Sequence, residues 1–148
     1  MDKESTLLQL RDAKKAHISW VRRAKALIEG LPIEKEQVAV DCTECMFGKW
    51  FYKEAQELNV LPNMESLKQI EKLHFKLHDV YMKIFKIYFG ETNRSLFSKL
   101  FGVKKKISER EQEMAHEHFK SLREISEQLV MAIERLERRL HAIKASSF

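Results

Sequence analysis

Residues 67–88 read LKQIEKLHFKLHDVYMKIFKIY and show the clearest helical periodicity in the chain. Their apolar side chains follow steps of three and four residues, which places them on one face of an α-helix: Leu67, Ile70, Leu77, Tyr81, Ile84 and Tyr88. Position 74 belongs to the same series, but it is a histidine. The pattern predicts a long amphipathic helix that ends at about Gly90 and carries an imidazole on its apolar face.

The N-terminal part of the chain repeats this arrangement. Its apolar or small residues again follow steps of three and four: Leu10, Ala13, Trp20, Ala24 and Leu27. Position 17 of that series is also a histidine. We expect a first helix over about residues 5–29, which ends near Gly30 and Pro32.

The C-terminal part predicts the longest helix, over about residues 108–144. Ser108 is followed three residues later by Glu111, the spacing of a capping box at a helix start. Apolar residues then recur at steps of seven, as in a helix that packs along its whole length: Leu122, Leu129, Leu136 and Ile143.

The connections between these helices are less regular. A further helix is expected after Pro32, with Val38, Cys42 and Cys45 on one face, and Gly48 should weaken it. Residues 91–107 contain a short apolar stretch that suits either a brief amphipathic helix or a hinge, and the sequence leaves both open.

Length and composition favour one all-helical domain. The chain has 148 residues, only four glycines and two prolines, and 33% charged residues. That length suits a single core, and the scarcity of turn residues favours long helices. We therefore predict an all-α fold, an antiparallel four-helix bundle that forms one domain over residues 1–148. The long last helix suggests a dimer contact or a rod that projects outward, and a homodimer is expected.

Several partner classes are disfavoured by the sequence. The opening MDKESTLLQLRDAKK is polar and amphipathic, and no apolar run approaches the roughly 20 residues of a membrane span. We expect a cytoplasmic protein without membrane contact, whose cysteines are thiols or metal ligands. The net charge is +5, but the basic cluster at residues 104–106 lacks interleaved aromatic residues, so nucleic-acid binding is not expected.

Three histidines and a cysteine form a candidate metal site. His17 and His74 occupy seam positions where a bundle normally has leucine or isoleucine, and His78 follows His74 by four residues on the same helical face. A lone histidine on such a face is usually a core residue with a hydrogen-bonded neighbour. Three of them together with Cys45 are better explained as ligands, because neutral imidazole and thiolate bind Zn²⁺.

Catalysis is not expected at this site. Four protein ligands fill a tetrahedral zinc site and leave no position open for water. The motif HFKLH also has Phe75 where metalloproteases have the glutamate that acts as general base. Cys42 lies three residues before Cys45, and two interpretations remain open for it: a small buried residue, or a thiol that forms a disulfide with oxidised Cys45.

The complete motif resembles the chemoreceptor zinc-binding (CZB) domain family. His17 matches its first-helix histidine, Cys45, Gly48 and Trp50 match its central motif, and His74 and His78 match its H-x-x-x-H pair, within about residues 10–90. The resemblance implies a bacterial regulatory module that binds zinc as a homodimer. It also implies a signalling partner of the chemotaxis or cyclic-di-GMP type, a chemoreceptor or a diguanylate cyclase. Neither a methyl-accepting hairpin nor a cyclase motif occurs in this chain.

The function implied by the resemblance is that of a sensor. Zinc occupancy, or the oxidation state of Cys45, would alter helix packing and so control the partner. One alternative is a di-iron bundle of the hemerythrin kind, for which Glu71 and His74 supply a Glu-x-x-His motif. Another is a dimerisation bundle without metal.

Overall fold

The computed structural model describes residues 2–31, 45–90 and 106–148, and every regular element in these ranges is a helix. The described part of the chain contains no strand, so the prediction of an all-α fold is confirmed there. No described helix combines the length and the hydropathy that a membrane span requires.

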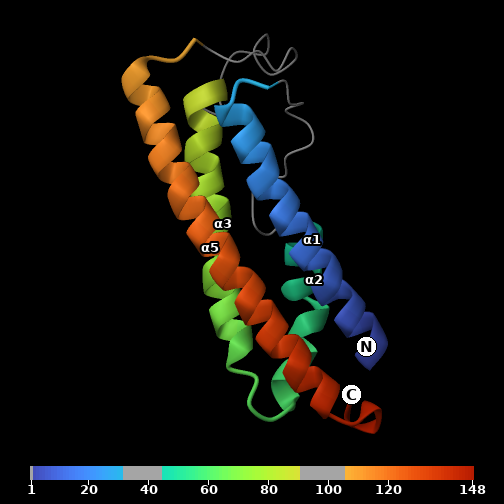
Figure 1. The fold of residues 1–148 in the computed structure, drawn as a ribbon. Helices are drawn as coiled ribbons and strands as arrows, with labels where there is room; N and C mark the ends of the chain where they lie inside the picture. The colour runs from blue at the N-terminus through green and yellow to red at the C-terminus, as the bar shows by residue number, and fades with distance from the viewer. Residues whose placement is uncertain (1, 32–44, 91–105) are drawn as a thin grey trace.

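Three long helices form the body of the molecule (Figure 1): α1 (Lys3–Ile28), α3 (Ser66–Phe89) and α5 (Glu109–Ala142). Helices α1 and α3 run in the same direction, and α5 runs antiparallel to both. Helix α5 packs against α3 and also against α1. The three helices therefore enclose a common core.

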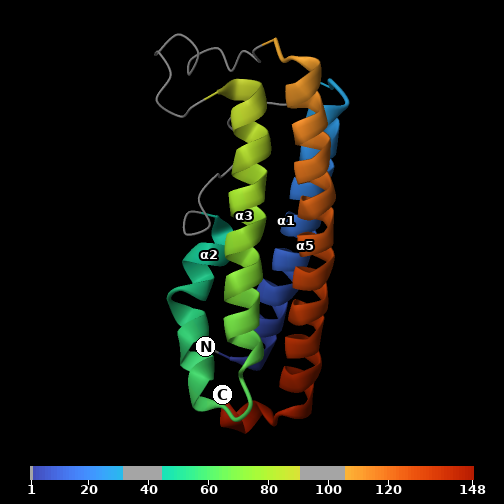
Figure 2. The same ribbon diagram turned by 90° about the vertical axis from the view of Figure 1, so that its left-hand side faces the viewer.

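Two shorter elements lie beside α3 in Figure 2: α2 (Met46–Phe51) and the 3-10 helix η2 (Glu54–Val60). They run opposite to α3, from its middle towards its N-terminal end, and α2 also contacts α1. A last 3-10 turn, η3 (Ala145–Ser147), follows α5. Helix α2 consequently approaches the core at the middle of α1 and α3.

The helix ends follow the predicted signals. Ser108 and Glu111 form a capping box in which the Glu111 backbone N–H donates to the Ser108 hydroxyl at 3.2 Å. At the other ends, Gly30 and Gly90 adopt positive φ angles of 79° and 76°, which glycine accepts without steric cost. Each predicted boundary of the three long helices agrees with the structure to within a few residues.

The predicted seams form the core. The six apolar residues of the α3 seam are all buried, and so are those predicted for the first helix and Leu122, Leu129 and Leu136 of α5. His17 and His74 are buried with them, at 2% and 1% exposure. Two ionisable side chains thus lie inside an apolar core, where unpaired polar groups are costly.

The prediction that Cys45 lies on a helical face is wrong. Its backbone is extended, with φ −71° and ψ 156°, and it is the N-cap of the six-residue helix α2. Gly48 does not interrupt that helix but lies buried within it. Its backbone N–H donates to the Cys45 sulfur at 3.2 Å, which is the bond that caps the helix. Val38 and Cys42, and most of the connection 91–107, lie outside the described residues.

Candidate metal centre

Three elements bring the four predicted ligands together in the core. His17 comes from α1, Cys45 from the start of α2, and His74 and His78 from successive turns of α3. All four side chains are buried, and one ligand atom from each lies within 4.8 Å of the others. Residues separated by up to 61 positions in sequence (78 − 17) therefore converge on one point.

Two of the donor separations approach the spacing of donor atoms around a tetrahedral metal. The Nε2 atoms of His74 and His78 are 3.1 Å apart, and the Cys45 Sγ is 3.3 Å from the His74 Nε2. Zinc bonds of about 2.0–2.1 Å to nitrogen and 2.3 Å to sulfur place their donors roughly 3.3–3.6 Å apart. A further contraction of the widest pairs would complete such a site.

A backbone hydrogen bond fixes the orientation of His17. Its Nδ1 lies 2.7 Å from the carbonyl oxygen of Ala13, one turn earlier on α1. Because a carbonyl only accepts, Nδ1 carries the proton and donates it, and Nε2 of the neutral ring keeps its lone pair. Metal-binding histidines are commonly held by such a bond from the second ring nitrogen.

Burial keeps the imidazoles neutral. Removal from water lowers the pKa of His17, although the hydrogen bond to Ala13 opposes this shift. Burial, together with the charges of His17 and His78, lowers the pKa of His74 to about 2. Neutral imidazole is the form that binds a metal ion.

The sulfur of Cys45 is also held in place. It accepts the Gly48 N–H at 3.2 Å, while the Cys45 carbonyl accepts the Lys49 N–H at 3.0 Å. Donors that point at sulfur stabilise the thiolate over the thiol, and the thiolate is the species that binds metal or reacts with oxidants.

Aromatic side chains surround the donor atoms. The Trp20 ring lies 4.3 Å from that of His78 and 5.0 Å from that of Tyr81, measured between centroids. The Phe47 ring lies 4.9 Å from that of His74 with its edge towards it. These rings exclude water and hold the imidazoles in place.

Two supporting groups were not predicted from the sequence: the Ala13 carbonyl and the Gly48 amide. Both belong to the backbone, so residue type carries little signal for them. Their positions still follow a rule, since a helical histidine can donate to the carbonyl four residues before it, and an N-cap side chain accepts the amide of N2 or N3.

No carboxylate belongs to the cluster in the part of the chain that the structure describes. Glu71, the residue that suggested a di-iron motif, is exposed and lies outside it. Oxygen-activating di-iron sites in bundles use several carboxylates, so the donor set of three nitrogens and one sulfur argues against that alternative.

Comparison with known protein families identifies the same region. The family model for the chemoreceptor zinc-binding domain matches residues 17–85, a segment that contains all four clustered side chains. No curated protein and no solved structure matches the chain. The match confirms the resemblance seen in the sequence: residues 17–85 of this chain match the chemoreceptor zinc-binding domain family.

Proposed function

We propose that His17, Cys45, His74 and His78 bind one Zn²⁺ ion and that the domain is a sensory module controlling a signalling partner. The observation that carries the proposal is the donor set itself: three imidazoles and one thiol, all buried, within 4.8 Å of one another. Nitrogen and sulfur donors in a dry, four-coordinate arrangement are those of structural zinc sites.

Some groups of the site would bind the ion, and others orient the side chains that bind it. His74 and His78 supply two donors from one rigid helix, and the bond to the Ala13 carbonyl presents the Nε2 of His17 to them. Cys45 supplies the one negative charge. Bound there, the ion would cross-link α1, α3 and the start of α2. The centre as a whole, Zn²⁺ with one thiolate and three neutral imidazoles, would have a net charge of about +1.

Cys45 is the residue that we propose as the switch. Unlike the histidines, it lies at the start of a six-residue helix, with extended backbone. A two-electron oxidant such as hypochlorous acid transfers one oxygen atom to the thiolate and departs as chloride, which leaves a sulfenic acid. The sulfur then loses its negative charge, so its bond to the zinc ion would be weakened.

The remaining features of the proposal come from the sequence and the family resemblance. We propose a single domain over residues 1–148 with four-helix-bundle architecture, in which α2 and η2 occupy the fourth position. We also propose a homodimer and, as partner, a signalling protein of the chemoreceptor or diguanylate cyclase type. We propose no catalysis, because four protein donors leave no open coordination position.

Elemental analysis of the purified protein tests the proposed function. We expect about one zinc atom per chain, less in His17→Ala, and unchanged zinc in the control His116→Ala, whose histidine is exposed on α5. Hypochlorous acid should release zinc from the wild type. Absence of zinc would support a metal-free dimerisation bundle, and two iron atoms per chain would support the di-iron alternative.

A further inference from the structure

The outer face of α1 carries an unusual row of side chains. Six residues follow one another at steps of three and four along this face, and all six are exposed: Leu8, Arg11, Lys15, Ile18, Arg22 and Lys25. We call this row the α1 basic seam. Four of its members are cations, two are aliphatic, and none is acidic. The seam spans about 25 Å at 1.5 Å per residue.

The cations of the seam are largely unneutralised. Within the described ranges, no ion pair involves Arg11, Lys15 or Arg22, and Lys25 reaches Glu29 only at 3.9 Å with both side chains more than half exposed. Asp12 is the one acidic residue beside the seam between its two ends. Like charges at steps of three and four repel each other along a helix, so an opposite charge bound there would be stabilised.

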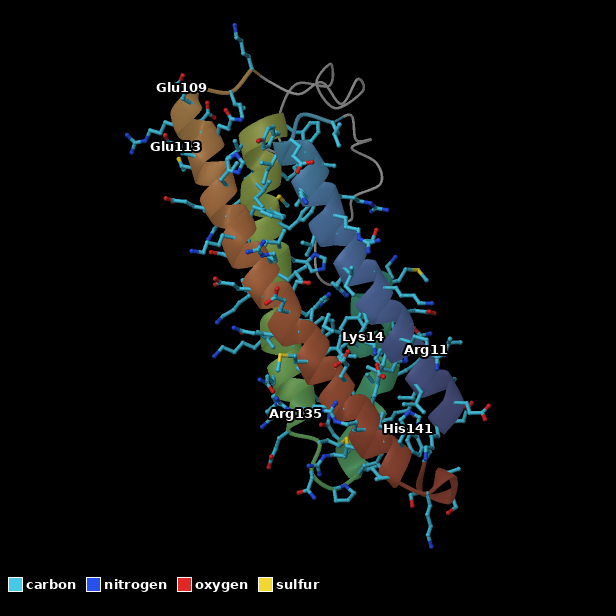
Figure 3. The ribbon with its side chains drawn as sticks, viewed as in Figure 1. Arg11, Lys14, Glu109, Glu113, Arg135 and His141 are labelled. Atoms are coloured by element: carbon cyan, nitrogen blue, oxygen red, sulfur yellow. The ribbon has the colours of Figure 1, made fainter. Side chains whose placement is uncertain are left out.

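Other cations of α1 are used differently. Lys14 forms an ion pair with Glu137 of α5 at 2.9 Å, and Figure 3 shows it between the two helices. Lys3 donates to the carbonyl oxygen of His141, at the C-terminal end of α5, at 2.9 Å. On the outer face, where Figure 3 labels Arg11, no described element supplies such partners. Lys14 and Lys3 thus have partners on α5, whereas the cations of the seam face solvent.

The exposed faces of the other long helices carry acidic residues among their cations. On α5, exposed glutamates such as Glu113 and Glu117 alternate with cations such as Lys120. On α3, the exposed lysines Lys68, Lys72 and Lys76 are accompanied by exposed Glu71 and Asp79. Lys83 pairs with Asp79 at 3.3 Å. Mixed charge is typical of a solvated surface, whereas a row of one sign is complementary to a ligand of the opposite sign.

We propose that the α1 basic seam is the docking surface for an acidic amphipathic helix of the signalling partner. Its steps of three and four are those along which two helices remain in contact. Acidic side chains at matching steps would meet the four cations. Leu8 and Ile18, which are 52% and 39% exposed, would cover two apolar residues of that helix.

The aliphatic positions distinguish this partner from other polyanions. Phosphate groups of nucleic acid make no use of Leu8 or Ile18, and the seam has no aromatic residue for base stacking. Two separated aliphatic side chains also form too little apolar surface to insert into a bilayer. A helix that carries acidic and apolar residues on one face would be complementary both to the cations and to the aliphatic side chains of the seam.

The seam and the metal centre share one rigid element. His17 lies on the inner face of α1, and Ile18, the next residue, lies on the outer face. A change at the metal centre that shifts α1 therefore shifts the seam with it. This regulatory meaning, and the identity of the occupant as the signalling partner, rest on the proposed function, whereas the binding of an acidic helix to the seam does not.

The test uses a synthetic helical peptide that carries glutamates and leucines on one face at the steps of the seam. Its affinity for the full chain is measured with the zinc-loaded and the chelator-treated protein. We expect binding that weakens with salt and falls at least about tenfold in the double variant Lys15→Glu/Arg22→Glu. The affinity of the peptide for the milder variant Arg11→Gln/Arg22→Gln should fall by a smaller factor. A peptide with glutamine in place of glutamate should bind weakly or not at all.

The matched control is Lys72→Glu/Lys120→Glu, which makes the same change in net charge at exposed lysines of α3 and α5. It should bind the peptide nearly as well as the wild type does. Equal weakening in both double variants, or no peptide binding, would overturn the proposal. So would seam-dependent binding to phosphatidylserine vesicles or duplex DNA without peptide binding. Zinc content of the same samples reports on the proposed function separately.

Discussion

At the scale of single residues, the two seam histidines are where the sequence departs most clearly from a simple core. Positions 17 and 74 follow the spacing of leucine and isoleucine, so their burial follows from the periodicity of their neighbours. Their convergence with Cys45 and His78 is a property of the folded chain. The cluster was predictable because polar residues at core positions need a partner, and here the candidates are few.

Substitution of the cysteine should separate metal binding from folding. We expect Cys45→Ala to lower zinc affinity by about a hundredfold or more, because it removes a charged donor, while the apolar seams keep the helices folded. Competition with a zinc chelator measures the affinity, and circular dichroism measures the helical content. Cys42→Ala, the control, should retain wild-type affinity. Unaltered affinity in Cys45→Ala would mean that another residue is the sulfur ligand.

Acidification should destabilise the metal-free protein. The pKa of His74 is lowered to about 2 in the folded state, chiefly by burial, and that of His17 is also lowered, whereas an unfolded histidine has a pKa of about 6.5. Below pH 6.5 the unfolded chain binds more protons, so the stabilising contribution is present above that pH and is lost as the pH falls further. Each histidine contributes a slope of up to about 1.4 kcal/mol per pH unit.

Urea unfolding of the chelator-treated protein at several pH values measures this slope. His17→Leu should flatten it, because leucine fills the seam without titrating, while His116→Ala should leave it nearly unchanged. A free energy of unfolding that is constant between pH 7 and about pH 5 would contradict neutral buried imidazoles.

At the scale of elements, local sequence signals determine where the long helices begin and end. The Ser108–Glu111 capping box and the glycines at positions 30 and 90 mark boundaries that the structure reproduces. Cys45 shows the limit of such reasoning. A cysteine at a helical spacing from Cys42 suggests a helical face, yet its sulfur accepts a backbone N–H and makes it an N-cap. Competition between a side chain and the backbone for that N–H is not visible in residue spacing.

Removal of the capping hydroxyl should weaken α5. Ser108→Ala leaves the Glu111 N–H without its acceptor at 3.2 Å, so we expect the free energy of unfolding to fall by about 1 kcal/mol. Ser121→Ala is the matched control, since Ser121 is exposed in the middle of the same helix, where alanine has the higher helix propensity. Chemical denaturation of both variants measures the difference. Equal stability of Ser108→Ala and the wild type would show that the capping box contributes nothing.

At the scale of the whole molecule, the helices that contribute donor atoms differ from the helix that makes the most extensive packing contacts. Helix α5 contacts both α1 and α3 along the core but supplies no residue to the cluster, whereas α1, α3 and the start of α2 meet at it. The all-α class followed from composition and periodicity. The parallel course of α1 and α3, and the contact of α2 with α1, were not determined by residue patterns, because periodicity fixes the face of a helix and not its direction or its neighbours.

Metal removal should therefore lower global stability. Binding to the folded state alone stabilises it by about 4 kcal/mol when free zinc exceeds its dissociation constant a thousandfold. We expect a chelator to lower the thermal midpoint of the wild type and to change that of His74→Ala much less. A midpoint that is independent of zinc in the wild type would show that the cluster does not couple metal binding to folding.

The most direct test of the central claim is X-ray absorption at the zinc edge of the purified protein. The account predicts one sulfur at about 2.3 Å and three nitrogen neighbours at about 2.0–2.1 Å, with imidazole scattering. In Cys45→Ala the sulfur contribution should disappear. Two sulfur neighbours, a shell of oxygen atoms, or a sulfur signal that persists in Cys45→Ala would contradict the assignment of His17, Cys45, His74 and His78 as the zinc ligands.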